Sequence, residues 1–298
     1  MSISTFTLEQ KGDHIVGRFS AMASPCELLI ETQDSMLANH LTSIAYTETK
    51  RIEQKFSRYL PSNTMANINH SQGRPVAIDN EIYRLLEFAN SCFELSEGMF
   101  DITSGVLRKA WKFDGSDNLP NPEAVKDLMP YIGWQKVKYN QSAITLTQGM
   151  ELDFGGIGKE YAVDCVAKLC AEHAPSKSVV VNFGGDIQVT RARSNKQPWH
   201  IGIESLENDK NATNILKIIS GGLATSGDAR RYLLKNGKRY SHILNPKTGY
   251  PLEAAPRSIT VVAPHCIQAG LLATLALLNG PQAETFLVQQ EVKFWCYR

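Results

Sequence analysis

The chain has 298 residues, of which 43% are hydrophobic and 20% charged, an ordinary globular composition that excludes disordered, collagen-like and low-complexity classes. Lys and Arg number 31 against 30 Asp and Glu, so the net charge of +1 argues against a nucleic-acid-binding or membrane-surface protein. The longest nearly apolar stretch, Ala269–Leu278, is too short to span a bilayer.

Neither the start of the chain nor its cysteines indicate export. Met1–Gln10 shows no basic n-region and no apolar h-region of a secretory signal, so we expect a cytoplasmic protein. The six cysteines form no CxxC pair and no Cys/His cluster with ligand spacing. Reduced, mostly buried thiols are therefore expected, and a zinc site is not.

The first hundred residues predict two strands followed by two helices. The strands span His14–Ala21 and Glu27–Glu31. Apolar residues at helical spacing predict a helix over Asp34–Phe56, capped by Asp34, and a second helix from Asp79 to near Gly98. The polar segment between them, Ser57–Ala77, is rich in turn formers and is predicted to be a loop.

The rest of the chain alternates short strands with two further main helices. A hairpin is predicted from Lys136–Tyr139 and Ala143–Thr147, and a glycine turn at Gly155–Gly158 precedes a helix to about His173. Further strands are predicted at Ser178–Val189 (interrupted by Gly184 and Gly185), His200–Glu204, Asn214–Ile219, Arg231–Leu234, Tyr240–Leu244, Ser258–Val262 and Val292–Cys296, with an apolar helix at Ile267–Leu278 and a short one after it. This order predicts an α+β fold with mixed, mostly antiparallel sheets and flanking helices. No GxGxxG follows the first strand, which disfavours a dinucleotide-binding domain.

The glycine turn at Gly155–Gly158 is a candidate phosphate site. Backbone amides at a helix N-terminus suit a phosphate, glycine allows close approach, and Lys159 in the first turn adds a positive charge. Turn and packing glycines explain the same pattern about equally well, and spacing alone leaves both interpretations open.

The densest polar stretch combines Ala224–Asp228 with Tyr240–Pro251. His242 beside Ser241, with Asp228 on a neighbouring segment, is a candidate for positioning or accepting a proton. A structural histidine that hydrogen-bonds a turn carbonyl is the alternative. A Ser-His-Asp hydrolase is less favoured, because no GxSxG motif is present.

Asp101 follows Gly98 and precedes a short predicted helix. It suits an N-cap, and its functional interpretation is a carboxylate that orients the polar edge of a ring. Phe56, Tyr59 and Trp111 are candidates for stacking on a planar ligand, although packing explains each of them as well.

Taken in order, six motifs resemble those of the ApbE family of FAD:protein FMN transferases. They are Ala21-Met22-Ala23-Ser24, Phe56-Ser57-Arg58-Tyr59, Gly98-Met99-Phe100-Asp101-Ile102-Thr103, Leu152-Asp153-Phe154-Gly155-Gly156-Ile157-Gly158-Lys159, Asn182-Phe183-Gly184-Gly185-Asp186-Ile187, and Ala224–Asp228 with Tyr240–Pro251. Each motif is weak by itself, but their order over most of the chain is specific.

The resemblance implies a single domain over residues 1–298 whose two halves surround a central FAD groove. It implies cleavage of the FAD pyrophosphate, transfer of FMN to a Thr or Ser hydroxyl of a target flavoprotein, release of AMP, and dependence on Mg²⁺. His242 and Asp228 would lie at the reacting phosphate, with His242 handling the proton. The implied FAD-binding residues are Met22, Tyr59, Met99, Phe100, Asp101, Asp153, Lys159, Thr225, Ser226 and Leu252.

The implied metal site departs from the family pattern. The family has Ala-Asp-x-x-x-Thr on the late helix, and its Asp and Thr bind magnesium; here Thr274 matches, but Gly270 stands at the Asp position. The other implied ligand is a backbone carbonyl near Gly156 and Gly158. A second departure is Glu160, where the family has Gly. The sequence leaves open whether the Glu160 carboxylate faces solvent, and whether Glu160 or Asp186 replaces the missing carboxylate. Gly270→Asp is expected to raise magnesium affinity, because a hard cation prefers a carboxylate.

Three alternatives to full transferase activity remain open from sequence. The loss of the Asp at position 270 is compatible with an FAD-binding relative of weak or no activity. Attack by water in place of the hydroxyl would give an FAD pyrophosphatase that yields FMN and AMP. The third alternative is an interaction protein with an empty groove. The sequence names neither the acceptor protein nor the oligomeric state.

Overall fold

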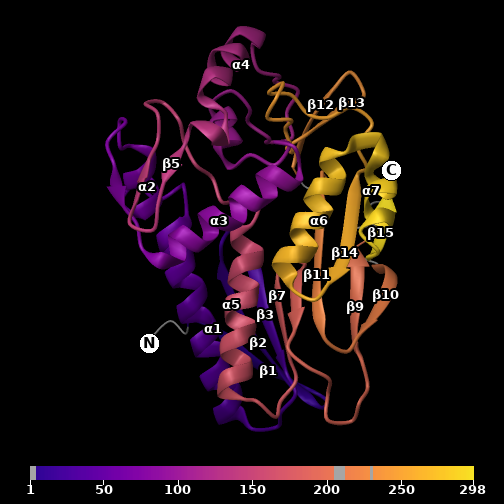
Figure 1. The fold of residues 1–298 in the computed structure, drawn as a ribbon. Helices are drawn as coiled ribbons and strands as arrows, with labels where there is room; N and C mark the ends of the chain where they lie inside the picture. The colour runs from indigo at the N-terminus through magenta and orange to yellow at the C-terminus, as the bar shows by residue number, and fades with distance from the viewer. Residues whose placement is uncertain (1–4, 205–211, 229–230) are drawn as a thin grey trace.

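A computed structural model describes residues 5–204, 212–228 and 231–298, and its centre is an eight-stranded sheet (Figure 1). The strand order is β1-β2-β3-β7-β8-β11-β14-β15, and every neighbouring pair is antiparallel. The strands are β1 (Thr7–Lys11), β2 (His14–Ala21), β3 (Ser24–Ile30), β7 (Val179–Phe183), β8 (Asp186–Val189), β11 (Gly221–Gly227), β14 (Ser258–Ala263) and β15 (Lys293–Tyr297). The predicted α+β class with mostly antiparallel strands is confirmed.

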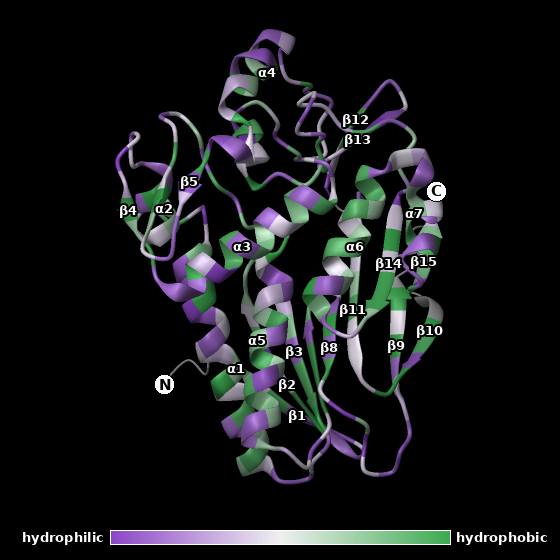
Figure 2. Ribbon diagram, viewed as in Figure 1, coloured by the Kyte–Doolittle hydropathy of each residue, from purple (hydrophilic) through white to green (hydrophobic). Residues whose placement is uncertain are grey.

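Three helices cover one face of this sheet: α1 (Ser35–Phe56), α5 (Gly158–His173) and α6 (Cys266–Leu278). Asp34 caps α1 by accepting hydrogen bonds from the amides of Met36 and Leu37, as predicted. Their apolar side chains and the facing strands form the largest core cluster. Figure 2 shows α6 as almost continuously hydrophobic, which fits a helix packed against both the sheet and α5.

The opposite face of the sheet is covered by the hairpin of β9 (Trp199–Glu204) and β10 (Ala212–Ile218). Ile187, Val189, Leu223 and Trp199 share a second core cluster on this side. Because side chains alternate along a strand, Asp186 of β8 and Ser226 of β11 point to the other side, toward α5 and α6. The helix-covered face therefore carries the side chains of Asp186 and Ser226.

The remaining elements gather at one end of the molecule and along the edge near the C-terminus (Figure 1). They are α2 (Thr64–Asn69), β4 (Val76–Ala77), α3 (Asn80–Leu95), η1 (Ile102–Lys109), α4 (Pro122–Leu128), η2 (Met129–Tyr131), η3 (Trp134–Lys136), β5 (Lys138–Tyr139), β6 (Ala143–Thr145), β12 (Tyr232–Lys235), β13 (Lys238–Ser241), η4 (Gly280–Gln282) and α7 (Ala283–Gln289). A third core cluster, which includes Leu107, Trp111, Val125 and Leu233, joins η1 and α4 to the β12–β13 hairpin.

Several sequence predictions need correction. The predicted loop Ser57–Ala77 contains α2 and β4, since Asn63 caps a helix there and Val76 pairs with Ile144. Ser178–Val189 is a hairpin of two strands turning at Gly184 and Gly185, both at positive φ. The strands β1 and β11 and the helix α4 were not predicted. Tyr240–Leu244 is shorter than expected, since β13 ends at Ser241 and His242 lies just after it.

Within the described ranges, none of the helices combines the length and hydrophobicity needed to cross a membrane. Residues 1–4, which belong to the segment inspected for a signal sequence, lie outside those ranges.

Candidate active site

The segments singled out in the sequence come together in the fold. The Phe100 ring lies 3.3 Å from the position that a Cβ on Gly156 would take, so the Asp101 loop contacts the glycine turn before α5. A Cβ on Gly98 would lie 3.8 Å from Cε of Lys247. The Trp111 indole, just after η1, donates a 2.8 Å hydrogen bond to the carbonyl of Gly249. The Asp101 loop, the glycine turn and the turn that follows His242 are therefore neighbours.

Lys159 in the first turn of α5 is directed at β8. Its Nζ lies 2.8 Å from Oδ2 of the buried Asp186, which forms an ion pair. Burial acts to lower the pKa of Lys159, but the adjacent Asp186 carboxylate outweighs it and the net shift is upward. A Cβ on Gly184 would lie 3.0 Å from Ser24 Oγ and 3.7 Å from this Nζ, so the Ala21–Ser24 turn is close to the same ion pair.

Glu160, the next residue, lies against α6. An ideal Cβ on Gly270 would be 2.7 Å from both Cγ and Oε1 of Glu160. Part of the Glu160 residue is accessible, but its Oε2 is buried and has no hydrogen-bond partner. Burial and the charge of Asp186 raise the pKa of Glu160 to about 8. The Glu160 carboxylate thus faces the α6 surface at Gly270 and does not face solvent.

Thr274 and Ser226 meet one turn of α6 beyond Gly270. Thr274 follows Gly270 by four residues, so both lie on one face of α6. Thr274 Oγ1 donates a 3.2 Å hydrogen bond to Ser226 Oγ of β11. Thr225 points to the opposite side of the sheet, where its hydroxyl lies 2.8 Å from that of Thr260. Only Ser226 of the two predicted phosphate contacts faces α6.

Asp228 directly follows β11, and its carboxylate lies between two arginine side chains. Its Oδ1 accepts a 3.1 Å hydrogen bond from Arg257 Nε, and its Oδ2 lies 3.3 Å from Arg239 Nε. Sequence reasoning did not identify these arginines, because neither lies in a recognisable motif. The Asp228 carboxylate therefore has its counter-charges within the protein.

His242 lies at the same end of β11 and is held by one backbone contact. Its Nδ1 is 3.1 Å from the carbonyl oxygen of Arg231. A carbonyl can only accept, so Nδ1 carries the proton and Nε2 of the neutral ring carries the free lone pair. Burial lowers the pKa of His242, an effect opposed by the nearby charge of Asp228.

Asp101 is buried and fully engaged in local structure. Its Oδ1 accepts hydrogen bonds from the amide and hydroxyl of Thr103, at 2.8 and 2.6 Å, and its Oδ2 accepts one from the amide of Trp134 at 3.0 Å. The predicted N-cap is confirmed. These contacts make Asp101 the residue that fixes the loop carrying Met99 and Phe100.

The other predicted FAD-binding residues differ in exposure. Tyr59 is 73% exposed, and the guanidinium carbon of Arg58 lies 5.0 Å from its ring centroid. Arg58 also pairs with Asp153, whose Oδ1 accepts from the amide of Gly155 at 2.9 Å. Met22, with φ of 51°, and Met99 and Leu252 are partly buried against the main core. Tyr59 is thus the most accessible aromatic side chain among the predicted site residues.

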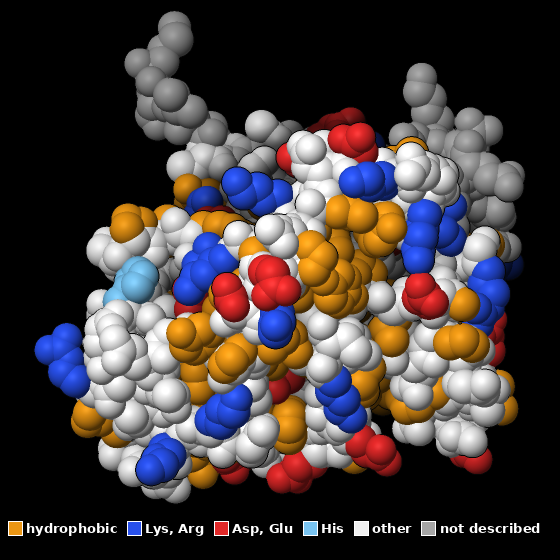
Figure 3. Space-filling view, turned by 90° about the horizontal axis from the view of Figure 1, so that it is seen from above, with side chains coloured by type: hydrophobic (Ala, Val, Ile, Leu, Met, Phe, Trp, Pro, Cys, Tyr) orange, Lys and Arg blue, Asp and Glu red, His pale blue; other side chains and the backbone are white. Residues whose placement is uncertain are grey.

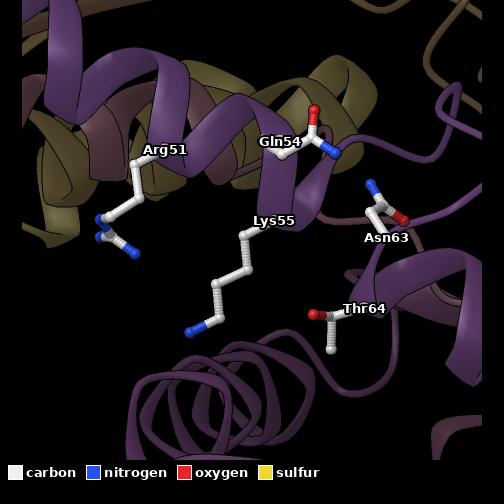
Figure 4. A pocket seen from close by; sticks show the side chains of 5 residues that line it. All are labelled: Arg51, Gln54, Lys55, Asn63 and Thr64. Carbon is white, nitrogen blue, oxygen red and sulfur yellow. The ribbon is translucent and has the colours of Figure 1, made fainter.

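A separate hollow lies between the C-terminal half of α1 and the start of α2 (Figure 4). It is lined by Arg51, Gln54, Lys55, Asn63 and Thr64 and includes none of the predicted site residues. Arg51 and Lys55 are already paired with Glu81, at 2.7 and 2.5 Å. We attach no function to this hollow, because its charges are compensated locally.

Comparison with known proteins now decides the family. The model of the ApbE family matches residues 22–296. This chain belongs to the ApbE family. A relative from Chlamydia pneumoniae named FAD:protein FMN transferase is 30% identical over 253 residues, covering 82% of this chain and 76% of that protein. One of the same name from Haemophilus influenzae is 29% identical and covers 78% and 70%. The prediction that the chain is a transferase is confirmed.

Solved ApbE structures share the fold over nearly the whole chain. The crystal structure of the ApbE protein from Thermotoga maritima has a TM-score of 0.85 with 26% identity and covers 98% of this chain and 94% of that one. The flavin transferase ApbE from Vibrio cholerae has a TM-score of 0.81 with 23% identity, covering 97% and 94%.

The region of the implied metal site holds the carboxylates of Glu160 and Asp186, and the Asp186 carboxylate is paired with Lys159. Among the residues that the structure describes, no three His, Cys, Asp or Glu side chains gather to hold a metal. Gly156 lies in the turn before α5, Gly158 is the first residue of α5, and Thr274 lies on α6. A cation here would have to combine hydroxyl and carbonyl oxygens with a carboxylate.

Proposed function

We propose that this ApbE chain transfers the FMN part of FAD to a Thr or Ser hydroxyl of an acceptor flavoprotein and releases AMP. Residues 1–298 act as one unit in this proposal, with FAD in a groove between its halves. The observation that carries it is that Ser226 of β11 meets Thr274 at 3.2 Å, while Asp228, two residues further along the chain, lies near enough to His242 for its charge to act on the ring. We take these groups to serve one reaction, and the names of the relatives support flavin as the substrate.

The reaction exchanges one phosphorus–oxygen bond for another. The acceptor hydroxyl oxygen bonds to the FMN phosphorus while the bond from this phosphorus to the bridging oxygen breaks. AMP leaves with the bridging oxygen, and the product is a phosphodiester. The hydroxyl proton passes to His242 Nε2, which is free to accept it because Nδ1 is committed to the Arg231 carbonyl.

Two groups of residues would hold FAD. Met22, Tyr59, Met99, Phe100 and Leu252 supply apolar and aromatic surface for the ring system, and Asp101 fixes the loop that carries two of them. Lys159, Ser226 and Asp153 with its neighbouring amide lie where the phosphates would approach. The Thr225 hydroxyl faces away from α6, so Thr225 would act on the site only through the backbone of β11.

The magnesium dependence rests on oxygen donors next to Thr274. The orphaned, buried Glu160 Oε2 fits a site for a hard cation, as do the Thr274 hydroxyl and backbone carbonyls near Gly156 and Gly158. Bound there, Mg²⁺ would neutralise charge on the pyrophosphate. The protein itself orients the phosphate through Lys159 and Ser226 and receives the proton at His242.

The acceptor must reach His242, which follows β13 at the α4 end of the molecule. Figure 3 looks onto this end and shows hydrophobic side chains near its middle, with acidic and basic side chains around them. Such a mixed surface suits contact with another protein.

Incubation with FAD, Mg²⁺ and a candidate acceptor flavoprotein tests the proposal. Flavin fluorescence in the denatured acceptor band, together with stoichiometric AMP, is the expected result. Free FMN and AMP without a labelled acceptor would indicate a pyrophosphatase. Bound FAD without AMP, across several acceptors, would indicate a flavin-binding protein.

A further inference from the structure

The strongest unexplained feature is the carboxylate of Glu160. It lies in the protein interior, where an unpaired charge is costly. Of the two other carboxylates nearby, Asp186 has Lys159 as its partner at 2.8 Å, and Asp164 accepts hydrogen bonds from two backbone amides of α6. Glu160 Oε2 has none. The structure therefore leaves one buried carboxylate oxygen without a hydrogen-bond partner.

The position of this carboxylate is fixed by the packing of α5 on α6. Asp164 of α5 accepts hydrogen bonds from the amides of Cys266 and Ile267, both at 3.0 Å, and so holds the start of α6 against α5. Glu160 precedes Asp164 by one turn, and Gly270 follows Cys266 by one turn, so the two residues meet in the antiparallel pair. The 2.7 Å separation between Glu160 and a Cβ on Gly270 is the consequence.

We propose that Glu160 is the carboxylate ligand of the divalent cation in this chain, occupying from α5 the space that a side chain at position 270 would occupy from α6. Thr274, on the same face of α6 as Gly270, supplies the neighbouring hydroxyl. The two departures from the family motifs are then one exchange: the carboxylate has moved from one helix to the other, and Gly270 leaves room for it. This inference rests on the proposed function for its biological role, but its test does not.

The exchange changes the expectation for Gly270→Asp. Sequence alone suggests that this substitution strengthens magnesium binding. In the structure its Cβ would collide with Glu160, and a second carboxylate would enter a buried space that already contains one. Gly270→Asp alone is therefore expected to weaken cation binding, and to help only when Glu160 is also replaced by Gly.

The test measures Mn²⁺ binding to the full chain by electron paramagnetic resonance, with and without FAD, and the Mg²⁺-induced rise in Tm. Glu160→Gln keeps the shape of the side chain and should weaken Mn²⁺ binding by about 10–100-fold or more, since even indirect partners of a metal contribute that much. The Mg²⁺-induced rise in Tm should disappear. Glu172→Gln, on the exposed part of the same helix, is the matched control and should leave both unchanged.

The double variant Glu160→Gly with Gly270→Asp should recover most of the affinity that Glu160→Gly loses. Wild-type Mn²⁺ affinity in Glu160→Gln would overturn the inference, even if the enzyme transfers flavin. Conversely, Glu160-dependent Mn²⁺ binding without flavin transfer to any acceptor would overturn the proposed function and leave the metal ligand established. A Glu160→Gln protein that unfolds would be replaced by the double variant, whose failure to bind Mn²⁺ counts against the exchange.

Discussion

Two buried carboxylates of the candidate site differ in the partners that the protein gives them. Asp228, at the end of β11, lies between Arg239 and Arg257. Glu160, at the start of α5, faces Gly270, and its Oε2 lacks a hydrogen-bond partner. The difference indicates that Asp228 is compensated by the protein and serves to position its surroundings, whereas Glu160 is prepared for a positive charge from outside.

The largest effect on the transfer reaction should come from replacing His242. His242→Ala is expected to lower the rate of flavin transfer by about 10²–10⁴-fold, the usual contribution of a positioned base. FAD affinity should change little, because the contacts that the structure gives this ring are the Arg231 carbonyl and the Phe113 ring, and neither residue is predicted to bind FAD. Single-turnover labelling and fluorescence titration measure the two effects; a loss confined to FAD affinity would make His242 a binding residue.

The comparison itself is tested by making the same substitution at both carboxylates. Asp228→Asn should lower the free energy of unfolding by about 1–3 kcal/mol, because it weakens the hydrogen bond from Arg257 and removes the charge that faces Arg239 in a buried setting. Glu160→Gln in metal-free protein should not lower it, since no protein partner is lost. Denaturant unfolding of both variants without metal gives the answer. Equal destabilisation would remove the distinction between the two sites.

The pH dependence of flavin transfer should follow the protonation of the His242 ring. The proposed base acts as the neutral ring, and burial lowers its pKa from the ordinary value of 6.5. Activity is therefore expected to be retained from neutral pH down past 6.5 and to fall only when the pH drops below the lowered pKa. A rate profile in excess FAD and Mg²⁺ measures this, with the stability of the protein checked over the same range. Because the pKa of Glu160 is raised to about 8, Mg²⁺ must saturate its site at every pH; an inflection above 6.5 that persists at saturating Mg²⁺ would contradict the assignment of His242.

The smallest effect should come from replacing the exposed Tyr59. Tyr59→Ala should weaken FAD binding by about threefold to tenfold, the contribution of one aromatic contact. Its ring is 73% exposed, so stability should hardly change. Tyr59→Phe is the control and should bind FAD almost as well as the unchanged protein. Fluorescence titration distinguishes these outcomes; unchanged affinity in Tyr59→Ala would place flavin elsewhere.

Local sequence patterns were sufficient for the long helices and most strands. Apolar residues at helical spacing and the side chains of Asp34 and Asp79 defined α1 and α3, because caps and periodicity act over a few residues. The strand β11 was missed although it lies between β8 and β14 in the sheet. Its sequence is rich in glycine and hydroxyl residues, which are weak strand signals. Gly222 is required there because a Cβ would lie 2.3 Å from the amide nitrogen of Cys266, a contact that no local pattern reveals.

The order of motifs along the chain identified the family, and the residue types within those motifs predicted which side chains line the site, because such residues are selected for their chemistry. The roles of individual carboxylates needed the tertiary structure. Whether Asp101 is free, whether Thr225 faces the same side as Ser226, and whether Glu160 meets Gly270 depend on contacts between residues far apart in the chain. Burial, charge pairing and hydrogen-bond satisfaction are properties of that packing, so they are decided only when the helices and the sheet come together.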